Sequence, residues 1–377
     1  MIRIKDAAKC SGCMTCMMVC PQGAIAKAEG PGGAIYPVVD KGKCVDCGRC
    51  ERVCPFLSGY LKTKPHGCIV GFTKEENIRS LCTAGGIFAA LAASILAQSG
   101  AVYGAAYGQG FVCSHICVEE VGDLPKILGK KYAESQAAEL FMNLKERLLN
   151  DQKVLFSGTP CQIAALRNYL GGTHRNLLCV QVNCSGVVTS GVWQAYLAYE
   201  GTPEQIELVN RIQGENKAGI RFVYDEEKQR CEVRSETAIH KMIKMGLGLR
   251  PACADCLFEK TGSADITLAR YNPALERSNE GTEIDAQRQP LGLARYHTPA
   301  GRQALEGVFD LLQYRPVTVK EAQKHLKKAH REKPRAEDSL KFIRLLESDG
   351  LAEALEKYTQ PTAFGNFIKS LRKIIFR

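Results

Sequence analysis

Residues 154–166 read VLFSGTPCQIAAL, and this short stretch already indicates the architecture of the chain. The apolar run at its start is typical of a buried strand, and Ser-Gly-Thr-Pro marks a tight turn. The proline and the apolar residues that follow it predict the start of a helix. A strand that passes through a short turn into a helix is the building unit of an α/β domain. A single cysteine, Cys161, stands at that turn.

The same alternation of strands and helices continues on both sides of this stretch. Short apolar runs at 68–72, 101–107, 177–182 and 264–271 predict further strands, and GGIFAALAASILAQ at 85–98 predicts a helix. This order predicts an α/β domain with a largely parallel sheet. Polar turns that bind ligands are then expected at the carboxyl ends of the strands.

The composition is that of an ordinary globular protein. The chain has 377 residues, enough for two or three domains, and 45% of them are hydrophobic. The start, MIRIKDAAKC, shows no secretory signal, and the longest apolar run, at 87–97, is too short to cross a bilayer. We therefore expect a cytoplasmic protein. Because cytosolic thiols are kept reduced, the 18 cysteines predict metal binding rather than disulfide bonds.

The formal net charge of +10 is concentrated near the C-terminus. Residues 315–335 carry eight Lys or Arg and two acids, and residues 364–377 carry four Lys or Arg and no acid. The rest of the chain is balanced, which argues against a basic core that binds nucleic acid. The tail, FGNFIKSLRKIIFR, can form a helix with one apolar face and basic flanks. Such a helix could pack on its own domain, lie on a membrane surface or dock on an acidic partner.

Two cysteine-rich motifs occupy the N-terminal part. CSGCMTCMMVCP at 10–21 has the spacing C-x2-C-x2-C-x3-C-P, and CVDCGRCERVCP at 44–55 repeats it. This spacing resembles that of two-cluster bacterial ferredoxins, in which the fourth cysteine of each run binds the other [4Fe–4S] cluster. Structural zinc is the alternative, but zinc motifs join CxxC units across longer gaps. The expected ligands form two sets, namely Cys10, Cys13, Cys16 and Cys54, and Cys44, Cys47, Cys50 and Cys20.

Four further cysteines lie at predicted loops. Cys161 follows one strand, Cys184 ends another, and Cys253 and Cys256 form a CADC segment before the last core strand. Four thiolates suffice for a third cubane. A buried free thiol is the plain alternative for each of them, and the CxxC pair alone could be a redox dithiol or half of a zinc site.

These motifs together resemble the coenzyme F420 hydrogenase/dehydrogenase beta-subunit family, in its bacterial form with a fused N-terminal ferredoxin domain. The specific segments are Gly-Thr-Pro-Cys-Gln at 158–162 and Arg-Pro-x-Cys-x-x-Cys at 250–256, which is followed by SADIT. CTAGGIF at 82–88, GKKYAES at 129–135 and Cys-Ser-Gly at 184–186 match further segments of the family.

The resemblance implies a flavin, FAD or FMN, beside a third [4Fe–4S] cluster, and two-electron exchange with a partner redox carrier. Carried over onto this chain, the third cluster takes Cys161, Cys184, Cys253 and Cys256. Glycines let the backbone approach the flavin, and helix starts and a lysine suit its phosphates. The chain departs from the family at LARYNPA (268–274) and at Ser185, where histidine is usual, which leaves the substrate pocket undefined. The implied flavin contacts are Thr83, Gly85, Gly86, Lys131, Tyr132, Ser135, Ser157, Gly158 and Thr159.

The remaining cysteines have plainer interpretations. FVCSHICVE places Cys113, His115 and Cys117 on one face of a strand, a spacing that could form a metal site but is more often a packed face. Cys82 adjoins the implied flavin turn and could be a packed thiol or a redox-active one. We expect the others to be packing residues, namely Cys68, Cys179 and Cys231.

The sequence thus predicts an α/β protein of three parts. Residues 1–60 form a small ferredoxin-like domain with two [4Fe–4S] clusters, residues 66–275 an α/β domain for flavin and [4Fe–4S], and residues 276–377 a mostly helical region with a basic tail. The expected function is that of a cytoplasmic iron–sulfur flavoprotein oxidoreductase. It passes electrons between ferredoxin, or a similar redox protein, and an organic substrate or deazaflavin-like carrier, and no catalytic residue is identified. The alternative is a non-catalytic electron-transfer subunit docked on a larger oxidoreductase.

Overall fold

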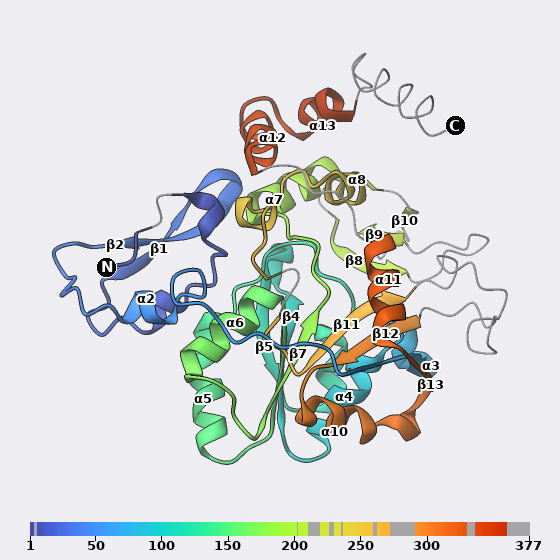
Figure 1. Ribbon diagram of the computed structural model, residues 1–377. Helices are drawn as coiled ribbons and strands as arrows, with labels where there is room; N and C mark the ends of the chain where they lie inside the picture. The colour runs from blue at the N-terminus through green and yellow to red at the C-terminus, as the bar shows by residue number, and fades with distance from the viewer. Residues whose placement is uncertain are drawn as a thin grey trace, which may run out of the picture.

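The protein is described by a computed structural model (Figure 1). The described residues are 1–3, 6–201, 203–209, 219–225, 230–234, 237–258, 262–271, 291–329 and 336–359. The basic tail at 364–377 and residues 272–274 of the LARYNPA segment lie outside them.

An eight-stranded mixed sheet forms the centre of the molecule. Its strands in spatial order are β13 (Leu312–Val317), β3 (Gly67–Thr73), β12 (Leu291–Tyr296), β11 (Ile266–Tyr271), β7 (Leu177–Val182), β6 (Val154–Gly158), β4 (Ala101–Tyr107) and β5 (Cys113–Val118). The four central strands, from β11 to β4, are parallel, and the outer pairings are antiparallel. The parallel part is therefore smaller than the alternating pattern predicts. A short connection such as that between β4 and β5 can join only antiparallel strands.

Helices cover both faces of this sheet. They are α3 (Glu76–Ser80), α4 (Ile87–Leu96), α5 (Phe141–Leu149), α6 (Pro160–Leu170), α10 (Pro299–Glu306) and α11 (Val319–Ala329). Along β6 the side chain of Leu155 packs in the same core as α4, while Val154 and Phe156 pack with α5 and α6 on the other side. Because both faces are buried, the central strands read as continuous apolar runs rather than as alternating ones.

A second core lies over the carboxyl ends of the parallel strands (Figure 1). Trp193 is buried within it, donates its indole N–H to the carbonyl of Phe111 at 2.9 Å, and stacks against Tyr107 and Tyr132. The elements of this region are α7 (Ser190–Tyr199), α8 (Ala238–Met245), α12 (Ala336–Asp349), α13 (Leu351–Thr359) and a small sheet of β8 (Gln205–Val209), β9 (Gly219–Asp225) and β10 (Arg230–Arg234).

The N-terminal ferredoxin domain packs directly on the rest of the molecule (blue in Figure 1). Its elements are η1 (Ala7–Lys9), α1 (Thr15–Met18), β1 (Ile25–Glu29), η2 (Pro31–Gly33), β2 (Ile35–Val39) and α2 (Arg49–Val53). At the tip of the β1–β2 hairpin a side chain on Gly33 would lie 2.9 Å from the nitrogen of Gly191, at the start of α7. The neighbouring N–H of Gly32 donates to the carboxylate of Glu347 on α12 at 2.7 Å. The hairpin therefore contacts two helices of the C-terminal half.

The predicted fold class is confirmed: a small ferredoxin-type domain, an α/β domain and helices toward the C-terminus. The central sheet continues past residue 275, however, because β12 and β13 pair on either side of β3. Residues 291–317 thus complete the α/β domain in space, and α11 to α13 follow it. Among the described residues no helix is both long and apolar enough to cross a membrane.

Candidate functional site

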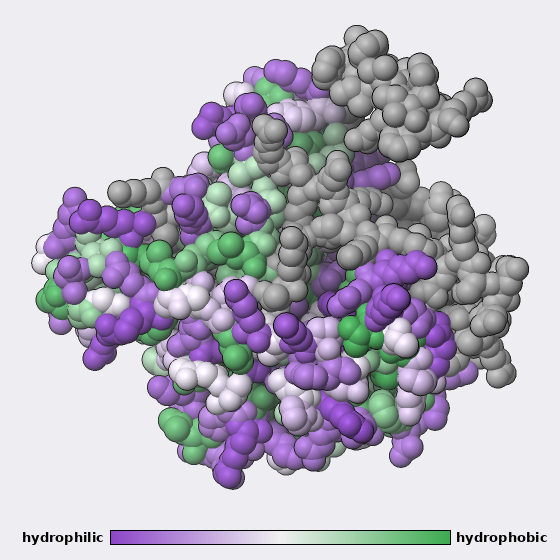
Figure 2. Space-filling model, in the orientation of Figure 1, coloured by the Kyte–Doolittle hydropathy of each residue, from purple (hydrophilic) through white to green (hydrophobic). Residues whose placement is uncertain are grey.

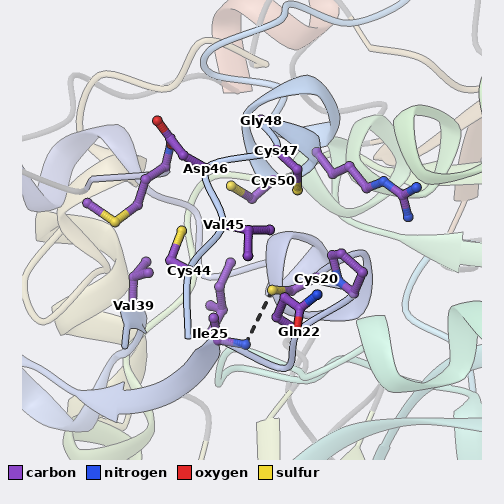
Figure 3. A pocket seen from close by; sticks show the side chains of 14 residues that line it. Cys20, Gln22, Ile25, Val39, Cys44, Val45, Asp46, Cys47, Gly48 and Cys50 are labelled. Atoms are coloured by element: carbon purple, nitrogen blue, oxygen red, sulfur yellow. Dashed lines mark hydrogen bonds and ion pairs between the residues drawn. The ribbon is translucent and has the colours of Figure 1, made fainter. Parts of the chain in front are cut away.

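Four cysteines of the ferredoxin domain surround one small cavity of about 20 Å³ (Figure 3). They are Cys20, Cys44, Cys47 and Cys50, the set that the motif spacing assigns to one cluster. The N–H of Ala24 donates to Cys20 Sγ at 3.3 Å, and hydrogen bonds to sulfur are among the factors that set cluster potentials. Cys50 is buried and Cys47 is exposed, so this cavity, termed here the distal site, reaches the protein surface.

The other ferredoxin cysteines, Cys10, Cys13, Cys16 and Cys54, form a second group, termed here the proximal site. Burial raises the pKa of the Cys16 thiol, and the nearby charges of the other three raise it further. Burial likewise raises the pKa of Cys54 to about 11, with contributions from Cys13 and Cys10. The N–H of Gly12 donates to Cys10 Sγ at 3.4 Å. All four thiols therefore lie close together, as the ferredoxin spacing predicts.

The four scattered cysteines also converge, and their position is termed here the third site. Cys161 lies at the start of α6 and Cys184 follows β7, while Cys253 ends η6 (Pro251–Cys253) and Cys256 follows three residues later. Burial raises the pKa of Cys161 to about 12, and the charges of Cys253 and Cys256 add to it. Burial raises the pKa of Cys253 to about 12, with Cys184 as the next contributor. Thiols so difficult to ionise become ligands only when a metal centre replaces their protons.

Backbone pairing between three loops holds the third site together. Val188 bridges to Ala133 on one side and to Leu249 on the other, and the N–H of Arg250 donates to the carbonyl of Val187 at 3.0 Å. A side chain on Gly186, whose φ is +108°, would lie 2.7 Å from a Leu249 methyl group. The loop that carries Cys184 is thus fixed against the loop that carries Cys253. The segment of residues 129–135 lies beside both.

The proximal and third sites adjoin each other. The charge of Cys13 acts on the Cys161 thiol, and α1 packs on α6. Cys16 and Cys54 of the proximal site also pack in one cluster with Cys20 and Cys50 of the distal site, so the proximal site adjoins both of the others.

Arg250 bridges the proximal and third sites. Its Nε donates to the carbonyl of Cys10 at 2.9 Å, and its two terminal nitrogens donate to Glu134 and to the carbonyl of Ile35. A side chain on Gly12, whose φ is +67°, would overlap the guanidinium at 2.5 Å. The Arg250 and Glu134 side chains are only 2% and 7% exposed. Despite its burial the pKa of Arg250 is raised, chiefly by Glu134.

The implied flavin contacts lie at three turns that are linked to one another. Cys82 packs with Leu128, which brings the turn before α4 to the segment of residues 129–135. His115 then joins that segment to the turn after β6, since its ring nitrogens bond Ser135 Oγ at 2.7 Å and the Ser157 carbonyl at 2.9 Å.

Several of these residues also have structural duties. A side chain on Gly85 would lie 2.4 Å from the Gly71 carbonyl oxygen, and Gly86 is the left-handed residue before α4. Lys131 Nζ donates to the Leu128 carbonyl at 2.6 Å, and the Tyr132 hydroxyl bonds His240 at 3.0 Å. Thr159 caps α6 through Gln162 in a capping box, and Gly158 packs beside it. The side chains of Thr83 and Ser157 are half-buried at the same edge.

The donor set suits an anionic nucleotide cofactor. Hydroxyl groups come from Thr83, Ser157 and Thr159, and the amine of Lys131 supplies a cation. Burial lowers the pKa of that amine to about 8, so it is still mostly protonated at pH 7. These are groups that bind the phosphates of a flavin nucleotide.

The ring nitrogens of His115 form hydrogen bonds within the protein and are not placed to bind a metal ion. Both its ring nitrogens are bonded, the ring stacks on Phe156, and burial lowers its pKa to about 4, so the imidazole is neutral. In the described part of the chain no three His, Cys, Asp or Glu side chains are placed to hold a single metal ion. A [4Fe–4S] cluster differs from a single ion, because each of its four irons binds a separate thiolate and the four thiolates surround the cluster. Cys68, Cys82 and Cys179 are buried.

Sequence reasoning missed two buried ion pairs that support the site. Arg167 on α6 donates to Asp265 at 2.8 Å, and Asp265 also accepts the N–H of Cys179 at 2.8 Å. This pair ties the helix that begins at Pro160 to the residue just before β11 and explains the aspartate in SADIT. The second pair is that of Arg250 with Glu134. In the sequence, the only indication of this second pair was that Arg250 and Glu134 each lie within a segment that resembles the family.

The comparisons with known proteins cover both halves of this arrangement. A model of the 4Fe-4S dicluster domain matches residues 9–57, and a model of the carboxyl-terminal part of the coenzyme F420 hydrogenase/dehydrogenase beta subunit matches residues 151–294. No curated protein matches the chain. Among solved structures, a chain of the xenon-derivatised F420-reducing [NiFe] hydrogenase complex from Methanosarcina barkeri is similar, with a TM-score of 0.49 and 16% identity over 77% of this chain and 95% of that chain. The chain thus combines an N-terminal part that matches dicluster ferredoxin domains with a segment that matches the coenzyme F420 hydrogenase/dehydrogenase beta-subunit family.

Proposed function

We propose that this chain is an iron–sulfur flavoprotein oxidoreductase that transfers electrons between a one-electron carrier and a two-electron partner. The observation that carries the proposal is the row of three cysteine sites that ends beside the flavin turns, with Cys13 next to Cys161 at its middle. A row of redox sites from the surface to a cofactor-binding edge is what a conduit for electrons requires. The carrier is ferredoxin or a similar protein, and the partner is an organic substrate or a deazaflavin-like carrier.

Each site contributes four thiolates toward one [4Fe–4S] cluster. When bound, the clusters carry single electrons and the flavin exchanges them in pairs. The chain itself holds the sites in fixed order and surrounds the inner ones with protein. Backbone N–H groups such as those of Gly12 and Gly186 donate to cysteine sulfur at 3.4 Å in both cases, which stabilises thiolate charge.

Thr83, Ser157, Thr159 and Lys131 would bind the flavin, and the turn glycines Gly85, Gly86 and Gly158 would let the backbone approach it. Tyr132 and Ser135 would act mainly by positioning, because Tyr132 is buried against Trp193 and Ser135 is bonded to His115. With these contacts the flavin would lie at the carboxyl edge of the sheet, where parallel α/β domains bind their cofactors.

A purified sample tests the proposal. We expect flavin absorbance together with about twelve iron atoms per chain, as three cubanes require, and reduction of an artificial two-electron dye acceptor. Iron without flavin, and no dye reduction, would instead support the alternative of a non-catalytic electron-transfer subunit. About eight irons without flavin would restrict the function to the ferredoxin domain.

Flavin affinity is expected to weaken as the pH rises above about 8, where free Lys131 loses its proton. An anionic cofactor favours the charged amine, so binding is strongest below pH 8 and falls by up to about tenfold per pH unit above it. Fluorescence titration of the apoprotein with FAD and with FMN between pH 7 and 9.5 measures this. Lys131→Met should weaken binding at pH 7 and remove the pH dependence. Lys126→Met, at an exposed lysine paired with Asp123, is the matched control and should change neither.

A further inference from the structure

A groove of about 410 Å³ lies at the seam between the ferredoxin domain and the α/β domain. It is termed here the docking groove. Three cations line it, Arg49 and Arg52 from α2 and Lys145 from α5, and none of the residues found to line it in the described part of the chain is acidic. The apolar part of its lining consists of Met18, Val19, Pro21, Val53 and Tyr169.

The docking groove adjoins the distal site. Cys20, Pro21 and Arg49 line both the groove and the cavity of the distal site. An occupant of the groove would therefore contact residues that also line that cavity, among them Cys20. In the row of three sites, the distal site lies farthest from the flavin turns and includes the exposed Cys47. Electrons that enter the row from outside should enter here.

The positive charge of the groove is directed outward. Arg49 and Arg52 lie three residues apart and so share one face of α2, and both are exposed. Glu51 on the same helix contacts the amino group of Met1 at 3.2 Å instead of an arginine. One nitrogen of Arg52 donates to the Cys47 carbonyl at 3.3 Å, which fixes that side chain over the distal site. A guanidinium fixed in this way still presents donors that suit a carboxylate.

We propose that the docking groove binds an acidic one-electron redox protein of the ferredoxin type, an inference that rests on the function proposed above. Carboxylates of the carrier would pair with Arg49, Arg52 and Lys145, and apolar groups at its rim would meet the groove's apolar side chains. Apolar residues are exposed on the same domain, with Val45 63% and Leu57 59% exposed, and Figure 2 shows hydrophobic and hydrophilic residues side by side there. One electron passes from the reduced carrier, which is oxidised, to the distal cluster, which is reduced; no bond or proton is transferred.

Charge reversal in the holoprotein tests the proposal. Stopped-flow mixing with a reduced acidic [4Fe–4S] ferredoxin at low ionic strength measures the second-order rate of cluster reduction, and calorimetry with the oxidised ferredoxin measures binding without electron transfer. We expect Arg49→Glu/Arg52→Glu to lower the rate by about tenfold or more and to weaken binding. The wild-type rate should fall as salt is added, and the variant rate should not. Lys341→Glu, an exposed lysine on α12, is the matched control and should behave as wild type.

Dithionite, a small reductant that needs no docking, separates this inference from the proposed function. It should reduce the clusters of the wild type and the variants equally, and a wild type without reducible clusters would overturn the proposed function itself. If the clusters are intact, equal ferredoxin rates and affinities in wild type and variant overturn the docking site alone. Lys145 lies on α5, across the groove from the cluster loops. Lys145→Glu should therefore lower the rate of cluster reduction by ferredoxin even if the arginine variant loses iron. An unchanged rate in Lys145→Glu would also contradict the proposal.

Discussion

Replacing Cys161 by serine is expected to lower the iron content from about twelve toward about eight atoms per chain. The thiol lies with Cys253 and Cys256 at the third site, and loss of one corner ligand should cost that cluster its stability. The distal and proximal sites use other cysteines, so their ferredoxin-type EPR signals should survive. Iron analysis with EPR of the dithionite-reduced protein measures both effects.

The matched control for this change is Cys117→Ser. Cys117 is another half-buried thiol, it lies on β5, and it belongs to none of the three sites. Its variant should keep about twelve irons per chain. The assignment of the third site is wrong if Cys161→Ser and Cys117→Ser contain the same amount of iron as the wild type.

Replacing Arg250 by methionine is expected to destabilise the protein by about 3–5 kcal/mol, because it leaves the buried carboxylate of Glu134 unpaired. The same change removes the hydrogen bonds to Cys10 and Ile35 and so loosens the ferredoxin domain. Because a nearby cation favours the more negative reduced state, the potentials of the proximal and third clusters should both become more negative. Denaturant unfolding and EPR-monitored redox titration measure the two effects.

A double change separates charge pairing from packing. In Arg250→Met/Glu134→Leu the unpaired charge is removed, and much of the lost stability should return, since an apolar replacement of a buried pair is often close to neutral. The potentials should move part of the way back, because the carboxylate that is removed disfavours the more negative reduced state. Arg302→Met breaks the exposed pair with Glu306 and should cost less than about 1 kcal/mol. Equal stability of Arg250→Met and wild type would show that Arg250 does not hold the two domains together.

The sequence predicted elements and local motifs better than long-range pairings. The strand–turn–helix at 154–166 appears as β6 and α6, with Thr159 as the cap and Pro160 at the first helical position, because these signals act over a few residues. The antiparallel flanks of the sheet were not predicted. Strand β3 pairs with β12 and β13, which lie more than 200 residues away along the chain, and apolar periodicity carries no information on such partners.

The same limit applies to the candidate site. Motif spacing grouped the ferredoxin cysteines, and the family resemblance grouped Cys161 with Cys184, Cys253 and Cys256. No local pattern, however, marks Arg250 as the partner of Glu134 or places Lys145 across from Arg49. Each of these relations depends on how separate loops and helices meet once the chain has folded. The flavin contacts stay a prediction, and the internal bonds of Lys131 and Tyr132 show that a motif residue can serve the fold as well as a cofactor.

The contact between the β1–β2 hairpin and helices α7 and α12 has a consequence for the rate of electron delivery. Many multidomain redox proteins carry a cofactor on a tethered module that must swing between donor and acceptor, and solvent friction then limits turnover. Here Gly33 meets Gly191 without room for a side chain, and Glu347 accepts the Gly32 N–H. The N-terminal module is thus held at a fixed separation from its acceptor. Internal transfer should be insensitive to viscosity and to the length of the segment between the two domains (residues 61–65), so that the encounter with the external carrier limits the rate.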